Sequence, residues 1–175
     1  YFQGRRDIDV DDYLDMISRK TGALIRNAMA LGAIVGGGDV NTVDAMTSCG
    51  RYLGYAFQIR DDYLGIWGDE AITGKPIGSD IIRKKSSLPI LHAMQQSSYA
   101  DRRKISDIYS KELVDSGDVD ALMSILDKSK SRVYVQALVE DYALSAGRSL
   151  DGLKLVDGTK AELDELVWFL TNREY

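Results

Sequence analysis

The chain has 175 residues and a net charge of −5 at pH 7, with 22 Lys and Arg against 27 Asp and Glu residues. No basic stripe stands out, which argues against nucleic acid as a partner. The single cysteine, Cys49, excludes a disulfide framework and is typical of a reducing compartment. The best apolar run, Ala28 to Val35, is too short to span a bilayer. We therefore expect one cytoplasmic domain without an integral membrane segment.

Two long helices are predicted in the first part of the chain. The first runs from Asp9 to about Val35, because apolar residues recur near helical spacing and acidic residues sit at its start, where they suit the helix dipole. The run Gly36-Gly37-Gly38 ends it. Asn41 or Thr42 is then predicted to cap the second helix, which continues to about Trp67.

A long irregular stretch from Gly68 to Ser87 follows these helices. Loops of this length inside a compact domain are usually functional. Leu88 opens the next helix, whose first turn tolerates Pro89. Further amphipathic helices are predicted over residues 101–113, 118–126, 130–150 and 160–172. With no convincing strand pair, repeat or low-complexity segment, the expected fold class is all-α.

The residues with the clearest chemistry stand where the second helix ends. Asp61 and Asp62 are adjacent there, and the glycine-rich loop after them carries Lys75. Carboxylates at the end of an apolar helix are costly to desolvate without a cation. Mg²⁺ suits such a place, because it binds a few carboxylates and fills its shell with water and phosphate oxygens. Lys75 would meet a phosphate as a point charge. The pattern predicts a Mg²⁺–diphosphate site at one end of a helical bundle.

This stretch, FQIRDDYLG followed by GKPIGSD and KKSSLP, resembles the second aspartate-rich region of the trans-isoprenyl diphosphate synthases, the polyprenyl synthetase family. The family pattern is FQxxDDxxD, then GKxxGSD, then a Lys before Leu-Pro, and the likeness runs from about Val10 to Arg173. It implies an isoprenoid-synthase-type helical bundle, present as a homodimer. The implied activity is that of a Mg²⁺-dependent prenyltransferase, which condenses an allylic prenyl diphosphate with isopentenyl diphosphate as geranylgeranyl or farnesyl diphosphate synthases do.

By that resemblance Asp61 binds Mg²⁺, Asp62 supports it, and Gln58 lines the diphosphate site. Gln58 and Asp61 are three positions apart, so a helix presents them on one face. The family motif closes with a third Asp, where this chain has Gly65. Metal binding is then expected to rest on fewer ligands, on Asp69, or on water. Taken alone, the aspartate pair would fit a solvated helix end equally well.

Basic residues from three parts of the chain complete the predicted site. Lys20 and Thr21 match the Lys-Thr element that faces the substrate diphosphate in the family. Lys75 and Lys85 match further diphosphate-binding lysines, although each lysine alone is more often an ordinary surface residue. The predicted catalytic residues are Asp61, Lys20 and Lys75. The predicted substrate contacts are Lys20, Thr21, Gln58, Lys75 and Lys85.

A second DDxxD, formed by Asp11, Asp12 and Asp15, is not the family's first aspartate-rich motif. That motif ends a long helix and precedes an Arg-Arg pair, whereas Lys20-Thr21 follows here. We interpret the three aspartates as first-turn acids. The sole histidine, His92, has no nearby partner in the sequence and is interpreted as structural.

The family's own first motif is expected upstream of this chain. Residues 1–4 (YFQG) resemble the remnant of a protease site in an expression tag, so residues 5–175 are interpreted as the C-terminal part of one polyprenyl synthetase domain. This polypeptide alone is then expected to be inactive. Two alternatives stay open: a terpene-cyclase-like relative, or a non-catalytic fragment or subunit that needs a complementing N-terminal half and exposes an apolar face without it.

Overall fold

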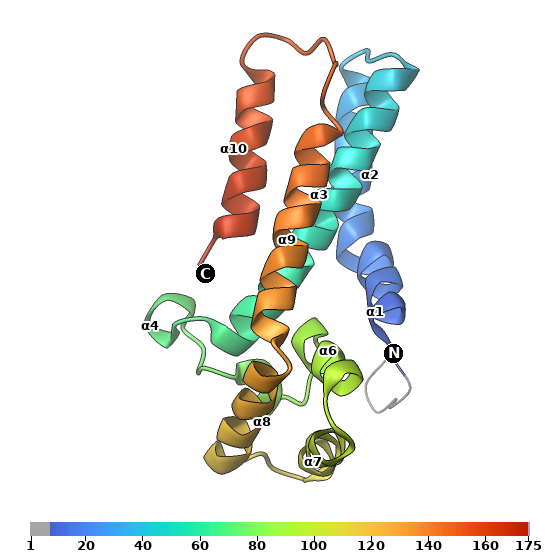
Figure 1. Cartoon of the computed structure of the whole chain (residues 1–175). Coiled ribbons are helices and arrows are strands. Elements are labelled where there is room, and N and C mark those ends of the chain that lie inside the picture. Colours follow the sequence, from blue (N-terminus) through green and yellow to red (C-terminus); the bar gives the residue numbers. More distant parts are fainter. Residues whose placement is uncertain (1–7, 175) are drawn as a thin grey trace. The chain divides into compact units, whose positions relative to one another are not determined.

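A computed structural model describes residues 8–174 of the chain, so the tag-like residues 1–4 lie outside the described range. Every element in that range is a helix, which confirms the predicted all-α class (Figure 1). In chain order the elements are α1 (Val10–Ile17), the π-helical turn η1 (Ser18–Gly22), α2 (Ala23–Val35), α3 (Val40–Trp67), α4 (Glu70–Thr73), α5 (Ser79–Ile82), α6 (Leu88–Gln96), α7 (Tyr99–Ser110), α8 (Ser116–Lys128), α9 (Ser131–Arg148) and α10 (Thr159–Asn172). Across residues 8–174 none of the helices combines the length and apolar character that crossing a bilayer requires.

The first predicted helix is interrupted by η1, which separates α1 from α2. Asp11 and Asp12 lie in the first turn of α1, as predicted. The interpretation of Asp15 as a first-turn acid is wrong, because this residue lies one turn further on. Its carboxylate pairs with Arg19 at 3.0 Å, four residues later on the exposed helix surface. An exposed pair at this spacing stabilises a helix by only about 0.3–0.5 kcal/mol.

Capping side chains start several helices earlier than the apolar spacing predicts. The carboxylate of Asp39 accepts a hydrogen bond from the backbone N–H three residues on, at 2.8 Å, so Asp39 caps α3 in place of the predicted Asn41 or Thr42. Ser98 caps α7 at 3.2 Å and Asp115 caps α8 at 2.9 Å in the same way. Each bond satisfies a backbone N–H that the first turn of a helix leaves without a partner.

The stretch predicted to be irregular, Gly68 to Ser87, contains the two short helices α4 and α5. Asp69 caps α4, since its Oδ1 accepts a hydrogen bond from the N–H of Ala71 at 2.8 Å. Gly74 ends α4 in the left-handed conformation with φ of 65°, which glycine adopts without strain. The carboxylate of Asp69, one of the predicted alternatives for the missing motif carboxylate, therefore serves as the cap of α4.

The described chain divides into two compact units. Unit 1 holds residues 8–13, 61–136 and 174, and unit 2 holds residues 14–60 and 137–173. The core of unit 1 is built by the end of α3 and by α5, α6, α7 and α8. Its buried side chains are Ile66, Ile81, Ile90, Ala93, Ile105, Ile108, Leu122, Ile125 and Leu126.

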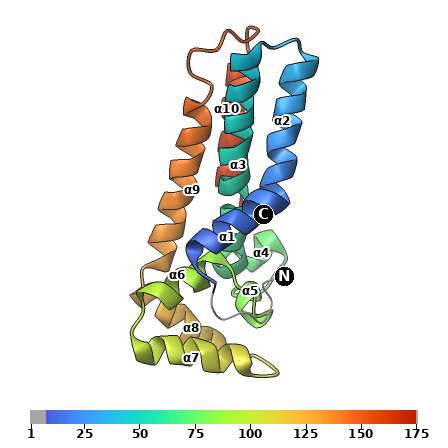
Figure 2. The same ribbon diagram turned by 90° about the vertical axis from the view of Figure 1, so that its right-hand side faces the viewer.

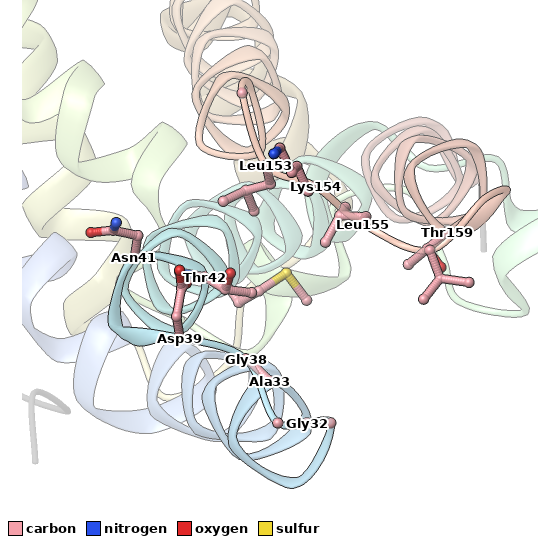
Figure 3. A pocket seen from close by; sticks show the side chains of 15 residues that line it. Gly32, Ala33, Gly38, Asp39, Asn41, Thr42, Leu153, Lys154, Leu155 and Thr159 are labelled. Atoms are coloured by element: carbon pink, nitrogen blue, oxygen red, sulfur yellow. Dashed lines mark hydrogen bonds between the residues drawn. The ribbon is translucent and has the colours of Figure 1, made fainter.

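Unit 2 is a bundle made from α2, α10 and the parts of α3 and α9 that belong to it, and Figures 1 and 2 show these helices side by side. Its buried side chains are Cys49, Leu53, Ala146, Leu150 and Val167. At one end of the bundle, the turn between α2 and α3 and the loop between α9 and α10 line an open pocket of about 780 Å³ (Figure 3). Glycines 36–38, Leu153 and Leu155 are among its lining residues, and the predicted site residues are not.

Candidate functional site

Two glycines one turn apart on α3 let η1 and α2 approach it closely in unit 2. A Cβ at Gly54 would lie 2.7 Å from the Cα of Gly22, and one at Gly50 would lie 2.8 Å from the Cα of Arg26. Backbone atoms block both places, so only glycine fits. The next residue of this row along α3, four positions after Gly54, is Gln58.

This close approach joins two of the predicted substrate contacts within unit 2. The hydroxyl of Thr21, in η1, donates a hydrogen bond of 2.7 Å to Oε1 of Gln58. The neighbouring Lys20 is exposed on η1. Single π-helical turns are frequent at functional sites, because they rotate side chains out of the regular helical row. The structure therefore links the Lys-Thr element directly to the FQ element of α3.

In unit 1 the ammonium group of Lys85 lies among carboxylates. Its Nζ is 2.8 Å from Oδ1 of Asp62, 3.0 Å from Oδ2 of Asp80 and 3.8 Å from Oδ2 of Asp61. Burial lowers the pKa of Lys85, but the charges and hydrogen bonds of Asp62 and Asp80 outweigh burial and raise this pKa above its ordinary value. Burial also raises the pKa of Asp80, against the opposing effect of Lys85. Lys85 is therefore held in its charged form.

The adjacent aspartates Asp61 and Asp62 have different surroundings. The side chain of Asp62 is 1% exposed and that of Asp61 is 43% exposed. Both oxygens of Asp62 are engaged, one by Lys85 and the other by the backbone N–H of Leu88 at 2.9 Å. The metal roles predicted for both residues stay predictions, and the geometry favours Asp61 as the ligand.

The donor chemistry around Asp61 fits Mg²⁺ better than a metal that needs a full protein cage. Within the described range no group of three or more His, Cys, Asp or Glu residues could hold a metal ion. Lys85 occupies the centre of the aspartates instead. Mg²⁺ accepts one or two carboxylates and takes its remaining ligands from water and phosphate oxygens. An exposed carboxylate such as that of Asp61 meets this requirement.

The loop that carries Lys75 is tied back to α3. The N–H of Gly78 donates to the carbonyl of Ile66 at 3.0 Å, and the hydroxyl of Ser79 donates to the carbonyl of Gly65 at 3.2 Å. Gly78 has a φ of 73°, a conformation that favours glycine at this turn. The side chain of Lys75 is exposed. A braced loop with an exposed lysine suits contact with a soluble anion.

The predicted residues divide between the two units. Asp61, Asp62, Lys75 and Lys85 belong to unit 1, whereas Lys20, Thr21 and Gln58 belong to unit 2. The convergence of Lys20 with Asp61 and Lys75 on one diphosphate therefore stays a prediction. Within each unit the structure joins Thr21 to Gln58 and Lys85 to the aspartates.

Sequence reasoning missed the part played by Asp80 and the pairing of Lys85. Asp80 stands in the GKPIGSD segment, but no role followed from the pattern. Its partner Lys85 is five residues away, which is not a spacing that a single helix turns to one face. The signal that was available is the GKxxGSD pattern itself, which ends on this aspartate.

Comparisons with known proteins agree on one family. The family model for polyprenyl synthetase matches residues 1–126. A short chain isoprenyl diphosphate synthase of Methanothermobacter thermautotrophicus is 36% identical over 177 residues, which cover 99% of this chain and 53% of the relative. A geranylgeranyl diphosphate synthase of Mycobacterium tuberculosis is 46% identical over 98 residues, which cover 56% of this chain and 28% of the relative.

Solved structures of the same group are also similar. The geranylgeranyl pyrophosphate synthetase of Pyrococcus horikoshii has a TM-score of 0.90 at 32% identity, over 99% of this chain and 52% of that chain. The geranylgeranyl pyrophosphate synthase of Corynebacterium glutamicum, complexed with isoprenyl diphosphate and magnesium, has a TM-score of 0.89 at 29% identity, over 99% and 49%. The chain thus spans about half the length of these proteins. With the family model matched over most of its residues, the chain belongs to the polyprenyl synthetase family.

Proposed function

We propose that this chain is the C-terminal part of a Mg²⁺-dependent prenyltransferase that joins an allylic prenyl diphosphate to isopentenyl diphosphate. The observation that carries the proposal is the arrangement in unit 1, where the partly exposed Asp61 lies beside the ion pair that the buried Asp62 makes with the partly exposed Lys85. The relatives support it, because they are short-chain isoprenyl, geranylgeranyl and farnesyl diphosphate synthases. One structural neighbour is complexed with isoprenyl diphosphate and magnesium.

Asp61 would hold the magnesium ion, with Asp62 in support. Mg²⁺ bound there supplies positive charge that stabilises the departing diphosphate. Asp62 has its two oxygens on Lys85 and on the N–H of Leu88, so we give it the task of orienting Lys85. The proposal predicts a metal affinity that depends on the Asp61 carboxylate and on diphosphate together.

The lysines supply the remaining charge. When the allylic C–O bond breaks, its electron pair leaves with the diphosphate, and the ammonium groups of Lys20 and Lys75 neutralise that charge. Thr21 and Gln58, already bonded to each other, would orient the same group. The double bond of isopentenyl diphosphate then attacks the allylic cation, and loss of a proton restores a double bond in the longer product. Homodimer formation is proposed from the family resemblance.

An exposed apolar stripe on α2 supports the interpretation as part of a longer domain. Leu24, Leu31 and Val35 are seven and four residues apart, which places them on one helix face, and all are exposed. Exposed apolar patches of this kind mark surfaces that pack against another polypeptide. The chain covers about half of its relatives, so we propose that the complementary N-terminal half covers this stripe. The second candidate function, a subunit that is inactive until complemented, rests on the same observation.

The test combines the purified chain with the N-terminal half of the Methanothermobacter relative, and radiolabelled isopentenyl diphosphate reports elongation. We expect a labelled prenyl diphosphate, longer than the allylic substrate, only when both halves, an allylic diphosphate and Mg²⁺ are present. Turnover of the allylic diphosphate without isopentenyl diphosphate would favour the cyclase alternative. Activity that survives Asp61→Ala in the complemented protein would contradict the proposed metal site. A chain that elongates without the second half would contradict the subunit candidate.

A further inference from the structure

Tyr13, in α1, places a buried hydroxyl beside the aspartates of unit 1. The side chain is 2% exposed, and its hydroxyl makes no hydrogen bond of normal geometry with a residue of the described range. Burial raises the pKa of this hydroxyl well above its ordinary value, and the nearby Asp62, followed by Asp61 and Asp80, raises it further. The hydroxyl therefore stays protonated and is an unused donor close to carboxylates.

A second tyrosine of unit 1 shows what a purely structural hydroxyl does in this region. The hydroxyl of the partly buried Tyr109 donates to the carbonyl of Lys85 at 3.1 Å, so it braces the backbone of that residue. The hydroxyl of Tyr13 contributes no such bond. A buried hydroxyl without a partner lowers the stability of a fold, so a structural role does not account for it.

Asp62 is the neighbour that can need this donor. Its carboxylate is 1% exposed and is held by Nζ of Lys85 at 2.8 Å and by the backbone N–H of Leu88 at 2.9 Å. The Lys85 side chain is 40% exposed, and its Nζ is 3.8 Å from Oδ2 of Asp61. A diphosphate bound beside Asp61 would attract this ammonium group and take the charged partner away from Asp62. A buried carboxylate that loses its partner is strongly destabilised.

We propose that Tyr13 is a positioning residue whose hydroxyl replaces Lys85 on the Asp62 carboxylate when Lys85 turns to a diphosphate bound beside Asp61. The proposal rests on the proposed function, which supplies the diphosphate. The hydroxyl already lies near Asp62, and its proton rotates freely about the C–O bond. The exchange keeps Asp62 in place while Lys85 adds its charge to the ligand.

A double-mutant cycle of Tyr13→Phe and Lys85→Met tests the exchange without a ligand. Tyr13→Phe alone should not lower the thermal midpoint, because it removes a hydroxyl that has no hydrogen-bond partner. Lys85→Met should lower the midpoint, and the double variant should fall by more than the sum of the single effects, since Asp62 then lacks both donors. Additive effects, or a lower midpoint in Tyr13→Phe alone, would overturn the proposal.

Two other tyrosines of unit 1 provide matched controls for the loss of a hydroxyl. Tyr109→Phe should lower the thermal midpoint by itself, because it breaks the bond to the carbonyl of Lys85. Tyr99→Phe should change neither the midpoint nor ligand binding, since Tyr99 is 74% exposed at the start of α7. A Tyr13→Phe variant that loses as much stability as Tyr109→Phe would show that Tyr13 is an ordinary structural residue.

Calorimetric titration with inorganic pyrophosphate in the presence of Mg²⁺ tests the exchange with a ligand. Tyr13→Phe should weaken pyrophosphate binding about 10- to 100-fold, which is the worth of one hydrogen bond to a charged group. Unchanged pyrophosphate affinity in Tyr13→Phe would overturn the inference while the proposed function stands. A wild-type chain that binds no pyrophosphate with Mg²⁺ would instead remove the proposed function, and the exchange with it.

Discussion

Thr21 and Gln58, which are 37 positions apart, are joined by a hydrogen bond of 2.7 Å from the Thr21 hydroxyl to Oε1 of Gln58. The bond connects the π-helical turn η1 to α3 within unit 2. It gives a structural reason for two elements that are far apart in the sequence to work together. A substrate contact made by Lys20 would then be coupled to the position of α3 through the neighbouring Thr21.

Thr21→Val should therefore destabilise the protein, although valine has nearly the same shape as threonine. The loss removes one partly buried hydrogen bond and leaves the Gln58 amide without this partner, which costs about 1–3 kcal/mol. Urea unfolding followed by circular dichroism measures the difference. Thr47→Val is the control, because the Thr47 hydroxyl donates to a carbonyl of its own helix, that of Val43. Equal losses in both variants would contradict a special role for the bond between helices.

Gly54→Ala should destabilise the protein, even though alanine is the better helix former by about 1 kcal/mol. The new Cβ would lie 2.7 Å from the Cα of Gly22, and a backbone atom cannot rotate away as a side chain can. Forcing an extra carbon into a packed contact costs about 1–3 kcal/mol. The free energy of unfolding in urea measures the balance.

Gly147→Ala, in α9, is expected to have the opposite effect on the free energy of unfolding. A Cβ at Gly147 meets nothing within 4 Å, so alanine there should stabilise the protein by about 0.5–1 kcal/mol. A stabilised Gly54→Ala variant, similar to Gly147→Ala, would show that η1 and α3 are not in close backbone contact.

Lys85→Met should destabilise the protein more than Lys75→Met. It leaves the buried carboxylate of Asp62 without its ammonium partner, and breaking a fully buried pair costs about 3–5 kcal/mol. Lys85 is 40% exposed, so solvent screening reduces the expected loss to about 2 kcal/mol. Lys75 is exposed on its loop, so Lys75→Met should keep the stability and weaken pyrophosphate binding. Calorimetric titration with pyrophosphate and urea unfolding separate these effects, and a stable Lys85→Met protein would contradict the first.

The sequence predicted the helices well, because their apolar spacing directly reflects one-sided burial. It misplaced the starts of α3, α7 and α8, where a single capping side chain outweighs the apolar pattern. The π-helical turn was not predictable from spacing, because five residues carry too little periodicity to show a change of pitch.

The candidate site, like the helices, could be predicted from the sequence only in part. Asp61 and the lysines stand in a recognisable order along the chain, so the pattern identified them as candidates. The different burial of Asp61 and Asp62 could not be read from two identical neighbouring letters. It arises from tertiary contacts, since Lys85 and the N–H of Leu88 approach from another segment. The interpretation of His92 as structural agrees with its burial, but its partner Ser131 is 39 positions away.

His92 should make the stability fall at acidic pH. Its Nδ1 lies 2.9 Å from the hydroxyl of Ser131, and its ring stacks on Tyr134 with the centroids 4.0 Å apart. Burial lowers the pKa of His92 below its ordinary value of 6.5, so the folded state prefers the neutral ring. The unfolded chain therefore binds more protons, and the stabilisation is complete above pH 6.5 and declines as the pH falls towards the lowered pKa. Urea unfolding at pH 7.5 and pH 5.5, compared with His92→Gln, isolates this effect from that of the carboxylates. As the sole histidine, His92 also gives one assignable NMR titration, and a midpoint above 6.5 would contradict the prediction.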